Sequence, residues 1–225
     1  ILLSNYKINT MTTITLLCTD PNHPIYHLLQ QWKSINDTLY TITLLNKVNE
    51  IVDGGDILFL VSCSEIVKEK TTSLFSHVLV LHASDLPVGR GWSPHIWDVL
   101  AGKSSLTLSL LEAKEPVDTG DIWKKQIIPP NGRELFDEIN ELLFQAELDL
   151  IEWACQNYHD CKPLPQGGIN NDYLRKRTPD DSELDINETL DSQFNLLRVC
   201  DPSRFPAFFY KDGQKYTIRI EKDEK

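Results

Sequence analysis

The sequence lacks a long apolar run and has fewer basic than acidic residues. No stretch of the 225 residues is apolar for long enough to cross a membrane, so we expect no membrane partner. Lysine and arginine number 22 against 33 aspartates and glutamates, which gives a net charge of −11. Proteins that grip phosphate backbones need a basic surface, so this balance argues against nucleic acid as the main partner.

Paired cysteine motifs are also missing. The five cysteines form no C-x-x-C pair and show no Cys/His spacing typical of zinc. An odd number of unpaired cysteines favours free thiols in a reducing compartment. We therefore predict a cytoplasmic protein without a metal site. The first predicted strand is not followed by G-x-G-x-x-G, which argues against a nucleotide-dependent oxidoreductase.

Apolar segments of strand length alternate with segments of helical spacing. Continuous apolar strands between helices are typical of a parallel sheet with helices on both faces, which predicts an α/β fold. The predicted strands are 14–18, 40–45, 57–61, 77–81, 106–111 and 122–128. The predicted helices are 24–34, 64–75, 93–101 (with Ser93 as its cap and Pro94 in its first turn) and 132–157.

The composition changes after the longest helix. Residues 160–190 are rich in Pro, Gly, Asp and Asn and are expected to be irregular. Residues 205–220 contain Asp-Gly between two strand-like runs, which predicts a small C-terminal hairpin. We predict an extension at 1–10, a main domain at 11–158, and an irregular segment with the hairpin at 159–225.

Three polar segments follow predicted strands. They read VSCS at 61–64, VLHAS at 80–84 and VDTGDIW at 117–123. In an open parallel sheet, ligands bind outside the carboxyl ends of the strands. A histidine beside an aspartate is a plausible acid–base pair, so His82 and Asp118 are candidate catalytic residues. Each also has a structural interpretation: a buried histidine with a partner, and a turn aspartate.

The combination of these residues carries more information than each of them alone. It resembles the motif of the folate-dependent formyltransferases, in which a histidine is followed by Ser-x-Leu-Pro, an Arg-Gly turn, a proline and tryptophan on a helix, and Asp-x-Gly before a strand. The matching residues are His82, Ser84, Leu86, Pro87, Arg90, Gly91, Pro94, Trp97, Gly102, Asp118 and Gly120. The resemblance is specific over residues 57–128.

The resemblance implies a Rossmann-like fold, 10-formyltetrahydrofolate as the donor and an amine as the acceptor. It implies that 11–158 is the catalytic domain and that His82 and Asp118 are catalytic. The cofactor would be bound by Ser62, Cys63, Ile66, Leu111, Glu112 and Ala113. The substrate would be bound by Ser84, Arg90, Gly91 and Trp92.

One position departs from the family pattern. The family places an asparagine two residues before the histidine, where it holds the formyl oxygen as that atom gains negative charge. This chain has Val80 there, which has no donor. Loss of such a donor costs about 100- to 1,000-fold in rate in other enzymes. Ser62, Cys63, Ser84 or backbone amides are the candidate replacements.

The acceptor is predicted by elimination. The first loop, CTDPNHPIYH, lacks the glycine-rich phosphate loop of the purine-pathway branch. The acidic charge and the chain length disfavour the initiator-tRNA branch. A nucleotide-linked amino sugar is therefore the expected acceptor, with Arg175, Arg177 and Arg198 as candidates for its pyrophosphate and a homodimer as an option. The alternative is a folate- or nucleotide-sugar-binding protein with impaired or altered catalysis, marked by Val80.

Overall fold

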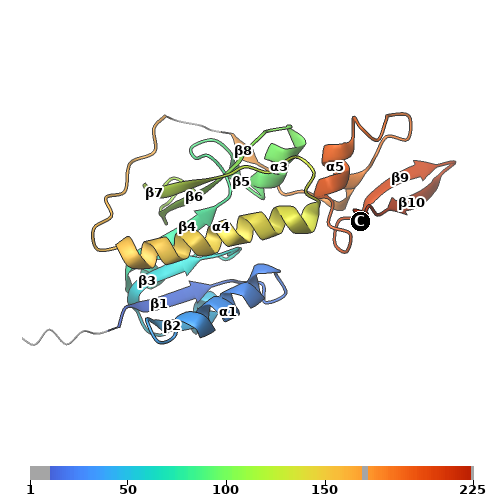
Figure 1. Ribbon diagram of the computed structural model, residues 1–225. Coiled ribbons are helices and arrows are strands. Elements are labelled where there is room, and N and C mark those ends of the chain that lie inside the picture. Colours follow the sequence, from blue (N-terminus) through green and yellow to red (C-terminus); the bar gives the residue numbers. More distant parts are fainter. Residues whose placement is uncertain (1–10, 169–171, 224–225) are drawn as a thin grey trace, which may run out of the picture. The chain divides into compact units, whose positions relative to one another are not determined.

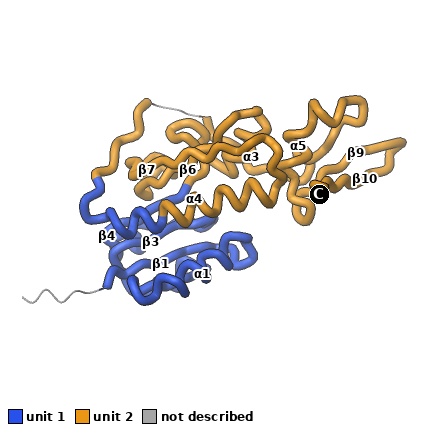
Figure 2. Tube along the Cα trace, viewed as in Figure 1, with its two compact units in different colours: residues 1–81, 151–161 blue, residues 82–150, 162–225 orange. Residues whose placement is uncertain are grey.

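The computed structural model describes residues 11–168 and 172–223, so the extension predicted at 1–10 lies outside the described residues. Figure 1 shows the helices and strands. Two compact units divide the chain. The first is 1–81 with 151–161, and the second is 82–150 with 162–225 (Figure 2).

The first unit contains parallel strands joined by helical connections. β1 and β2 pair from Thr13↔Thr41 onward, β1 also pairs with β3, and β3 pairs with β4, all in parallel. The strands are β1 (Thr13–Leu17), β2 (Thr41–Leu45), β3 (Gly55–Leu60) and β4 (Phe75–His82). The helices are α1 (Ile25–Asn36), η1 (Val48–Glu50) and α2 (Glu69–Thr72). The apolar residues Ile14, Leu16, Ile57 and Leu79 are fully buried, as expected for a sheet whose strands read as continuous apolar runs.

The second unit contains an antiparallel strand pair, β6 (Leu106–Glu112) and β7 (Ile122–Ile128). Its helices are α3 (Pro94–Leu100), η2 (Pro179–Ser182) and α5 (Phe194–Val199), and α4 (Phe136–Asn157) contributes residues to both units. Its short strands are β5 (Arg90–Gly91), β8 (Tyr173–Leu174), β9 (Ala207–Lys211) and β10 (Gln214–Ile218). The six main strands follow the order β2-β1-β3-β4-β6-β7, which confirms the mostly parallel α/β sheet.

The helix predicted over 64–75 is wrong apart from Glu69–Thr72. Residues 64–68 form a loop instead, because polar groups of other segments bond to it. The Ser64 backbone N–H donates to Thr19 Oγ1 (2.9 Å), and the Glu65 carboxylate accepts from the Val48 backbone N–H (3.4 Å). Side-chain bonds of this kind compete with helix formation, so the apolar spacing alone was misleading.

Two helix starts differ from the prediction. α4 begins at Phe136 and not at residue 132, because the Glu134 carboxylate accepts hydrogen bonds from the Asn131 and Gly132 backbones and folds this segment into a turn. Ser93 does precede α3, but its backbone is left-handed (φ 45°) and its side chain makes no capping bond. Pro94 occupies the first turn, as predicted.

The predicted C-terminal hairpin is confirmed. β9 and β10 pair antiparallel around Asp212 (φ 51°) and Gly213 (φ 78°), a pair of left-handed residues that matches the twist of a two-residue hairpin. Ala207 packs into a small apolar cluster with Leu184, Leu197 and Cys200. The segment predicted to be irregular contains β8 and η2, and β8 pairs with β5.

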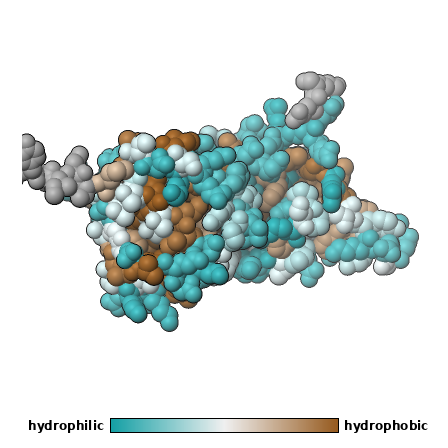
Figure 3. All heavy atoms as spheres, turned by 90° about the horizontal axis from the view of Figure 1, so that it is seen from below, coloured by the Kyte–Doolittle hydropathy of each residue, from teal (hydrophilic) through white to brown (hydrophobic). Residues whose placement is uncertain are grey.

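Several large apolar side chains of the first unit stay exposed, among them Ile35, Leu39 and Val52. Apolar residues also gather in one part of the face that Figure 3 shows. Across 11–168 and 172–223, no helix is both long enough and apolar enough to span a membrane.

Candidate active site

The last residue of β4, His82, faces Asp118. His82 Nδ1 lies 3.5 Å from Asp118 Oδ1, and both side chains are more than nine-tenths buried. The second ring nitrogen of His82, Nε2, lies 2.9 Å from the Gly89 carbonyl oxygen. The sequence predicted that these two side chains meet, and the geometry brings them together.

The two contacts of His82 orient its ring. A carbonyl oxygen only accepts, so Nε2 donates to the Gly89 carbonyl oxygen. Nδ1 faces the Asp118 carboxylate at 3.5 Å. A histidine that a carboxylate orients in this way can exchange a proton with a reacting atom.

The loop that carries Asp118 is held by backbone and side-chain contacts. Asp118 has a left-handed backbone (φ 63°), which is uncommon for a residue other than glycine. Gln166 Nε2 donates to the carbonyl oxygens of Asp118 (3.0 Å) and Gly120 (2.8 Å). The Gly91 backbone N–H donates to Asp118 Oδ2 at 3.3 Å. The carboxylate is therefore oriented toward His82 by groups on two other segments.

Close packing explains why the last residue of the Asp-Thr-Gly turn, Gly120, is a glycine. A Cβ atom at this position would lie 1.7 Å from the Glu112 carbonyl oxygen, so only glycine lets the loop approach β6 this closely. Arg90 ties the same loop from the other side, because its Nε and Nη2 both donate to the Val117 carbonyl oxygen (3.2 and 2.7 Å). In this arrangement Arg90 positions the Asp118 loop.

The other predicted substrate residues have contacts of their own within the second unit. Gly91 (φ 110°) pairs with Leu174, and a Cβ there would lie 2.3 Å from the Leu174 carbonyl oxygen. Trp92 is 40% exposed, and Lys176 Nζ lies 4.9 Å from its ring centroid. Ser84 is buried, and its Oγ has no hydrogen-bond partner among the residues that the structure describes. These residues all belong to the second unit, but their contact with a substrate stays a prediction.

The predicted cofactor residues fall into two groups. Leu111, Glu112 and Ala113 lie at the end of β6, where a register shift occurs between Leu110 and Leu111, and Leu111 is fully buried. Glu112 Oε1 accepts from Trp123 Nε1 at 2.8 Å. The remaining three, Ser62, Cys63 and Ile66, lie in the loop after β3 in the first unit.

Within that loop of the first unit, Ser62 has a left-handed backbone (φ 47°) and its Oγ lies 3.5 Å from His23 Nε2. Burial raises the pKa of the Cys63 thiol, which keeps it protonated and unreactive. The part of the chain that the structure describes holds no cluster of three or more His, Cys, Asp or Glu side chains placed to bind a metal.

The arginines expected at a pyrophosphate are engaged with protein groups. Arg175 pairs with the Asp181 carboxylate and lies over Trp97, 5.0 Å from its centroid. Arg177 donates to the Asp181 carbonyl oxygen at 3.0 Å. Arg198 is only 4% exposed and bonds to Asn195. Their role as phosphate ligands stays a prediction.

Sequence reasoning missed the groups that hold His82 and Asp118 in place. Gln166 lies 48 residues from Asp118, and nothing in its local sequence points to that contact. The Gly89 carbonyl and the β5–β8 pairing were also missed, because backbone acceptors and two-residue strands leave no sequence pattern. The Gly-Arg-Gly run at 89–91 was the one available signal that this turn is special.

Comparison with known proteins identifies relatives of the chain. No protein-family model matches it. It is 24% identical over 205 residues to methionyl-tRNA formyltransferase of Clostridium acetobutylicum, with 90% of this chain and 63% of the relative covered. It is 27% identical over 183 residues to the enzyme of the same name from Finegoldia magna, with 80% and 56% covered. The chain thus spans less than two thirds of the length of these relatives.

Solved structures share its fold. Methionyl-tRNA formyltransferase from Clostridium thermocellum superposes with a TM-score of 0.80 at 19% identity, with 95% of this chain and 94% of that chain covered. A sugar N-formyltransferase from a Shewanella species gives a TM-score of 0.71 at 18% identity, with 96% and 99% covered. HypX from Aquifex aeolicus in complex with tetrahydrofolic acid gives 0.74 at 17% identity, with 94% and 38% covered. The resemblance that the motif over residues 82–120 predicted is confirmed, and the chain is related to the folate-dependent formyltransferases.

Proposed function

We propose that the chain is an N-formyltransferase that takes the formyl group from 10-formyltetrahydrofolate and transfers it to an amine. The observation that carries this proposal is the buried His82–Asp118 pair, with a 3.5 Å contact between Nδ1 and Oδ1, on a motif like that of the formyltransferases. The tetrahydrofolate bound to HypX, a protein of the same fold, supports the identity of the donor.

The reaction assigns a task to each member of the pair. The acceptor nitrogen attacks the formyl carbon, a C–N bond forms, and the formyl oxygen gains negative charge. His82 donates a hydrogen bond or its proton to that oxygen. The bond from the formyl carbon to N10 of the folate then breaks, and the proton lost by the amine ends on N10. Asp118 orients the imidazole and holds its positive charge.

His82 must exchange one hydrogen bond to do this. Its Nε2–H donates to the Gly89 carbonyl oxygen, and in the reaction the same hydrogen would turn to the formyl oxygen. The valine at position 80 leaves the family's second donor absent. Among the candidate replacements, Cys63 Sγ contacts the Glu65 carbonyl oxygen and Ser62 Oγ contacts His23, whereas Ser84 Oγ is uncommitted but buried.

For the acceptor, the first candidate is a nucleotide-linked amino sugar. The second unit exposes Trp92 (40%) and Tyr173 (55%), and Lys176 lies over the Trp92 ring. A planar base can stack on exposed aromatic rings, and neighbouring cations attract phosphate. The net charge of −11 also favours a small acceptor over a polyanionic one.

Methionyl-tRNA is the second candidate, and one specific observation favours it. The curated relatives described above are methionyl-tRNA formyltransferases, and the chain matches 63% of one of them. A local basic surface can suffice for tRNA even on an acidic protein.

The experiment supplies purified protein with 10-formyltetrahydrofolate and either nucleotide-linked amino sugars or methionyl-tRNA. Release of tetrahydrofolate gives the rate, and mass spectrometry identifies the formylated product. Formylation of an amino sugar supports the first candidate, and formylation of tRNA alone replaces it with the second. Folate binding by calorimetry without turnover on any amine would identify the chain as a binding protein, and the absence of folate binding would refute the proposal.

A further inference from the structure

A cavity lies in the second unit, away from His82. Its volume is about 280 Å³, and it is lined by Gly102, Lys103, Ser104, Asn131, Asn195 and Arg198, among others. These residues come from the segment after α3, the segment after β7, and α5. The cavity is too small for a drug-sized ligand, but it is large enough for a phosphate group.

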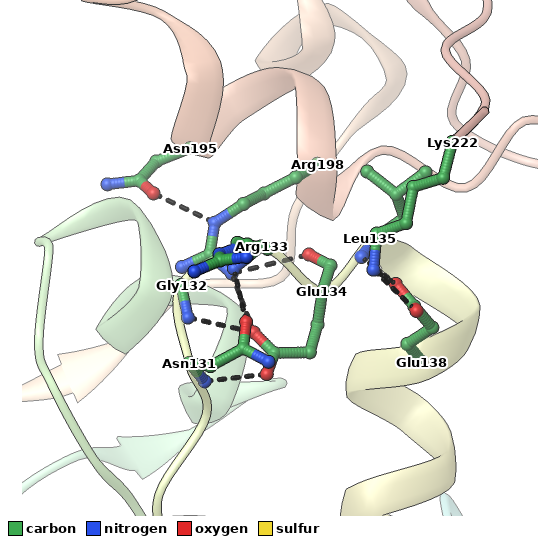
Figure 4. A network of polar contacts seen from close by, with 9 residues as sticks. All are labelled: Asn131, Gly132, Arg133, Glu134, Leu135, Glu138, Asn195, Arg198 and Lys222. Atoms are coloured by element: carbon green, nitrogen blue, oxygen red, sulfur yellow. Dashed lines mark hydrogen bonds and ion pairs between the residues drawn. The ribbon is translucent and has the colours of Figure 1, made fainter. Parts of the chain in front are cut away.

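The cavity adjoins a buried guanidinium. Arg198 is 4% exposed, and its Nε donates to Asn195 Oδ1 at 2.9 Å. Its Nη1 donates to the Glu134 carbonyl oxygen (3.3 Å) and lies 3.8 Å from the Glu134 carboxylate. Figure 4 shows this network.

The acidic group nearest to Arg198 is already engaged. Glu134 accepts hydrogen bonds from the Asn131 (2.6 Å) and Gly132 (3.0 Å) backbones. Burial acts to raise the pKa of its carboxyl, but these bonds and Arg198 lower it on balance, so the group is ionised. Glu134 therefore compensates Arg198 only in part, because its closest guanidinium contact is a long one.

The side-chain amides around the cavity present hydrogen-bond donors to it. Asn195 Oδ1 accepts from Arg198, so the Nδ2 amide nitrogen is turned away from the guanidinium (Figure 4), and it is the nearest atom, at 3.9 Å, to a Cβ placed on Gly102. Asn131 Oδ1 accepts from the Arg133 backbone N–H, so the donor that its side chain can offer is the NH2 group. Lys103 adds a cation that pairs with Asp98 at 2.7 Å.

Three carbonyl oxygens near the end of α3 accept backbone hydrogen bonds. The backbone N–H groups of Ala101, Gly102 and Lys103 close the end of α3 by bonding to Trp97, Val99 and Asp98. A cavity with two side-chain NH2 groups, one hydroxyl and an incompletely paired guanidinium matches an oxyanion, which is a pure acceptor.

The cavity is also separate from the catalytic pair. Its lining comes from residues just before β6 and just after β7, whereas Asp118 follows the opposite end of β6. A strand of seven residues is roughly 20 Å long at about 3.3 Å per residue, so one ligand group cannot occupy both places.

We propose that this cavity is a binding site for a phosphate group, either free phosphate or a phosphomonoester, held by Arg198, Asn195, Asn131 and Ser104. The site is independent of the formyl-transfer chemistry at His82, and its occupancy ties α5 to the segments that follow α3 and β7.

The test is calorimetric titration of the full chain with inorganic phosphate and with glycerol phosphate, against chloride at equal ionic strength. We expect saturable phosphate binding with a Kd of about 1 mM or tighter. The diagnostic variant is Asn195→Asp, which keeps the oxygen that Arg198 bonds to but replaces the donor with a negative charge. We expect its phosphate affinity to fall at least tenfold. Tighter binding of one of the two probes identifies the source of the group.

Two controls make the result decisive. Asn22→Asp makes the same change of charge on the exposed loop before α1, and its phosphate affinity should equal that of the unchanged protein. His82→Asn must also retain phosphate binding. Absence of saturable binding, equal loss in both Asp variants, or loss of binding in His82→Asn would each overturn the proposal. Matching melting temperatures without phosphate show that Asn195→Asp is folded.

Discussion

Asp118 meets His82 through a backbone conformation that most residues avoid. Its φ of 63° turns the carboxylate so that Oδ1 lies 3.5 Å from His82 Nδ1 and Oδ2 accepts from the Gly91 N–H. Asparagine tolerates the left-handed region nearly as well as aspartate and has the same shape. We therefore expect Asp118→Asn to lower turnover by about 100- to 10,000-fold while the melting temperature stays within a few degrees.

The matched control for Asp118→Asn is Asp121→Asn, three positions along the chain, where the carboxylate pairs with exposed Lys114. Its turnover should be close to that of the unchanged protein. If Asp118→Asn instead lost stability and kept proportionate activity, Asp118 would be a structural turn residue and not a catalytic one.

Gly120 gives a stability prediction. Replacement with alanine puts a Cβ 1.7 Å from the Glu112 carbonyl oxygen, so either the loop or β6 must move. We expect a loss of several kcal/mol of unfolding free energy, at the upper end of single-substitution effects. Gly167→Ala is the control, because nothing lies within 4 Å of its Cβ position, and urea unfolding compares the two. Equal curves would show that the loop relaxes freely.

Val80 tests whether the missing donor limits the rate. Residues 80 and 82 of β4 are two apart, so their side chains point to the same face of the strand. Val80→Asn restores a side-chain donor beside His82, and we expect formyl transfer to rise by about tenfold or more. Single-turnover rates with 10-formyltetrahydrofolate measure this. A fall in rate with unchanged folate affinity would show that another group already fills the role.

Glu147 on α4 predicts a pH dependence of stability. The residue is 6% exposed, its Oε2 has no partner among the described residues, and burial raises the pKa of its carboxyl to about 8. The folded state thus binds this proton more tightly than the unfolded state does. The stability it confers is fully present below about pH 4.5 and is lost as the pH rises toward 8.

Glu147→Gln removes that loss. Between pH 5 and pH 7 the unchanged protein should lose about 2–3 kcal/mol of unfolding free energy relative to the variant, because each pH unit over which Glu147 must stay protonated costs about 1.4 kcal/mol. Urea denaturation at several pH values measures it, and Glu141→Gln on the exposed face of α4 is the control. Parallel pH profiles for all three proteins would contradict the assignment.

The sequence predicted the sheet strands well because their signal is local. The run from Ile57 to Val61 is apolar over a strand length, as burial of both faces requires, and Leu106 to Leu111 alternates apolar with polar residues at the period of a strand. The Asp212-Gly213 pair allowed the hairpin to be predicted, because a tight turn needs residues that adopt the left-handed conformation. The contact of His82 with Asp118 spans 36 residues, so their pairing could be predicted only from their places after predicted strands and from the family motif.

The parts that sequence reasoning missed depend on distant partners. Residues 64–68 have helical spacing, yet Thr19 and Val48 hold them in a loop, and nothing within the segment encodes these contacts. The Arg90 guanidinium is a group that often binds substrates, but here it donates to the Val117 backbone carbonyl. A side chain's chemistry can be inferred from sequence, whereas the group that satisfies it depends on the fold.

The division of the chain also limits how the protein can be dissected. The first unit consists of residues 1–81 and 151–161, so the chain passes from one unit to the other after Leu81, Leu150 and Cys161. No single cut releases either unit intact, because a fragment that ends before Ile151 lacks part of the first, and one that starts at His82 carries the end of α4 without its strands. We expect protease nicking in the 172–193 region to leave the fragments associated, and truncation at either end of α4 to leave insoluble protein.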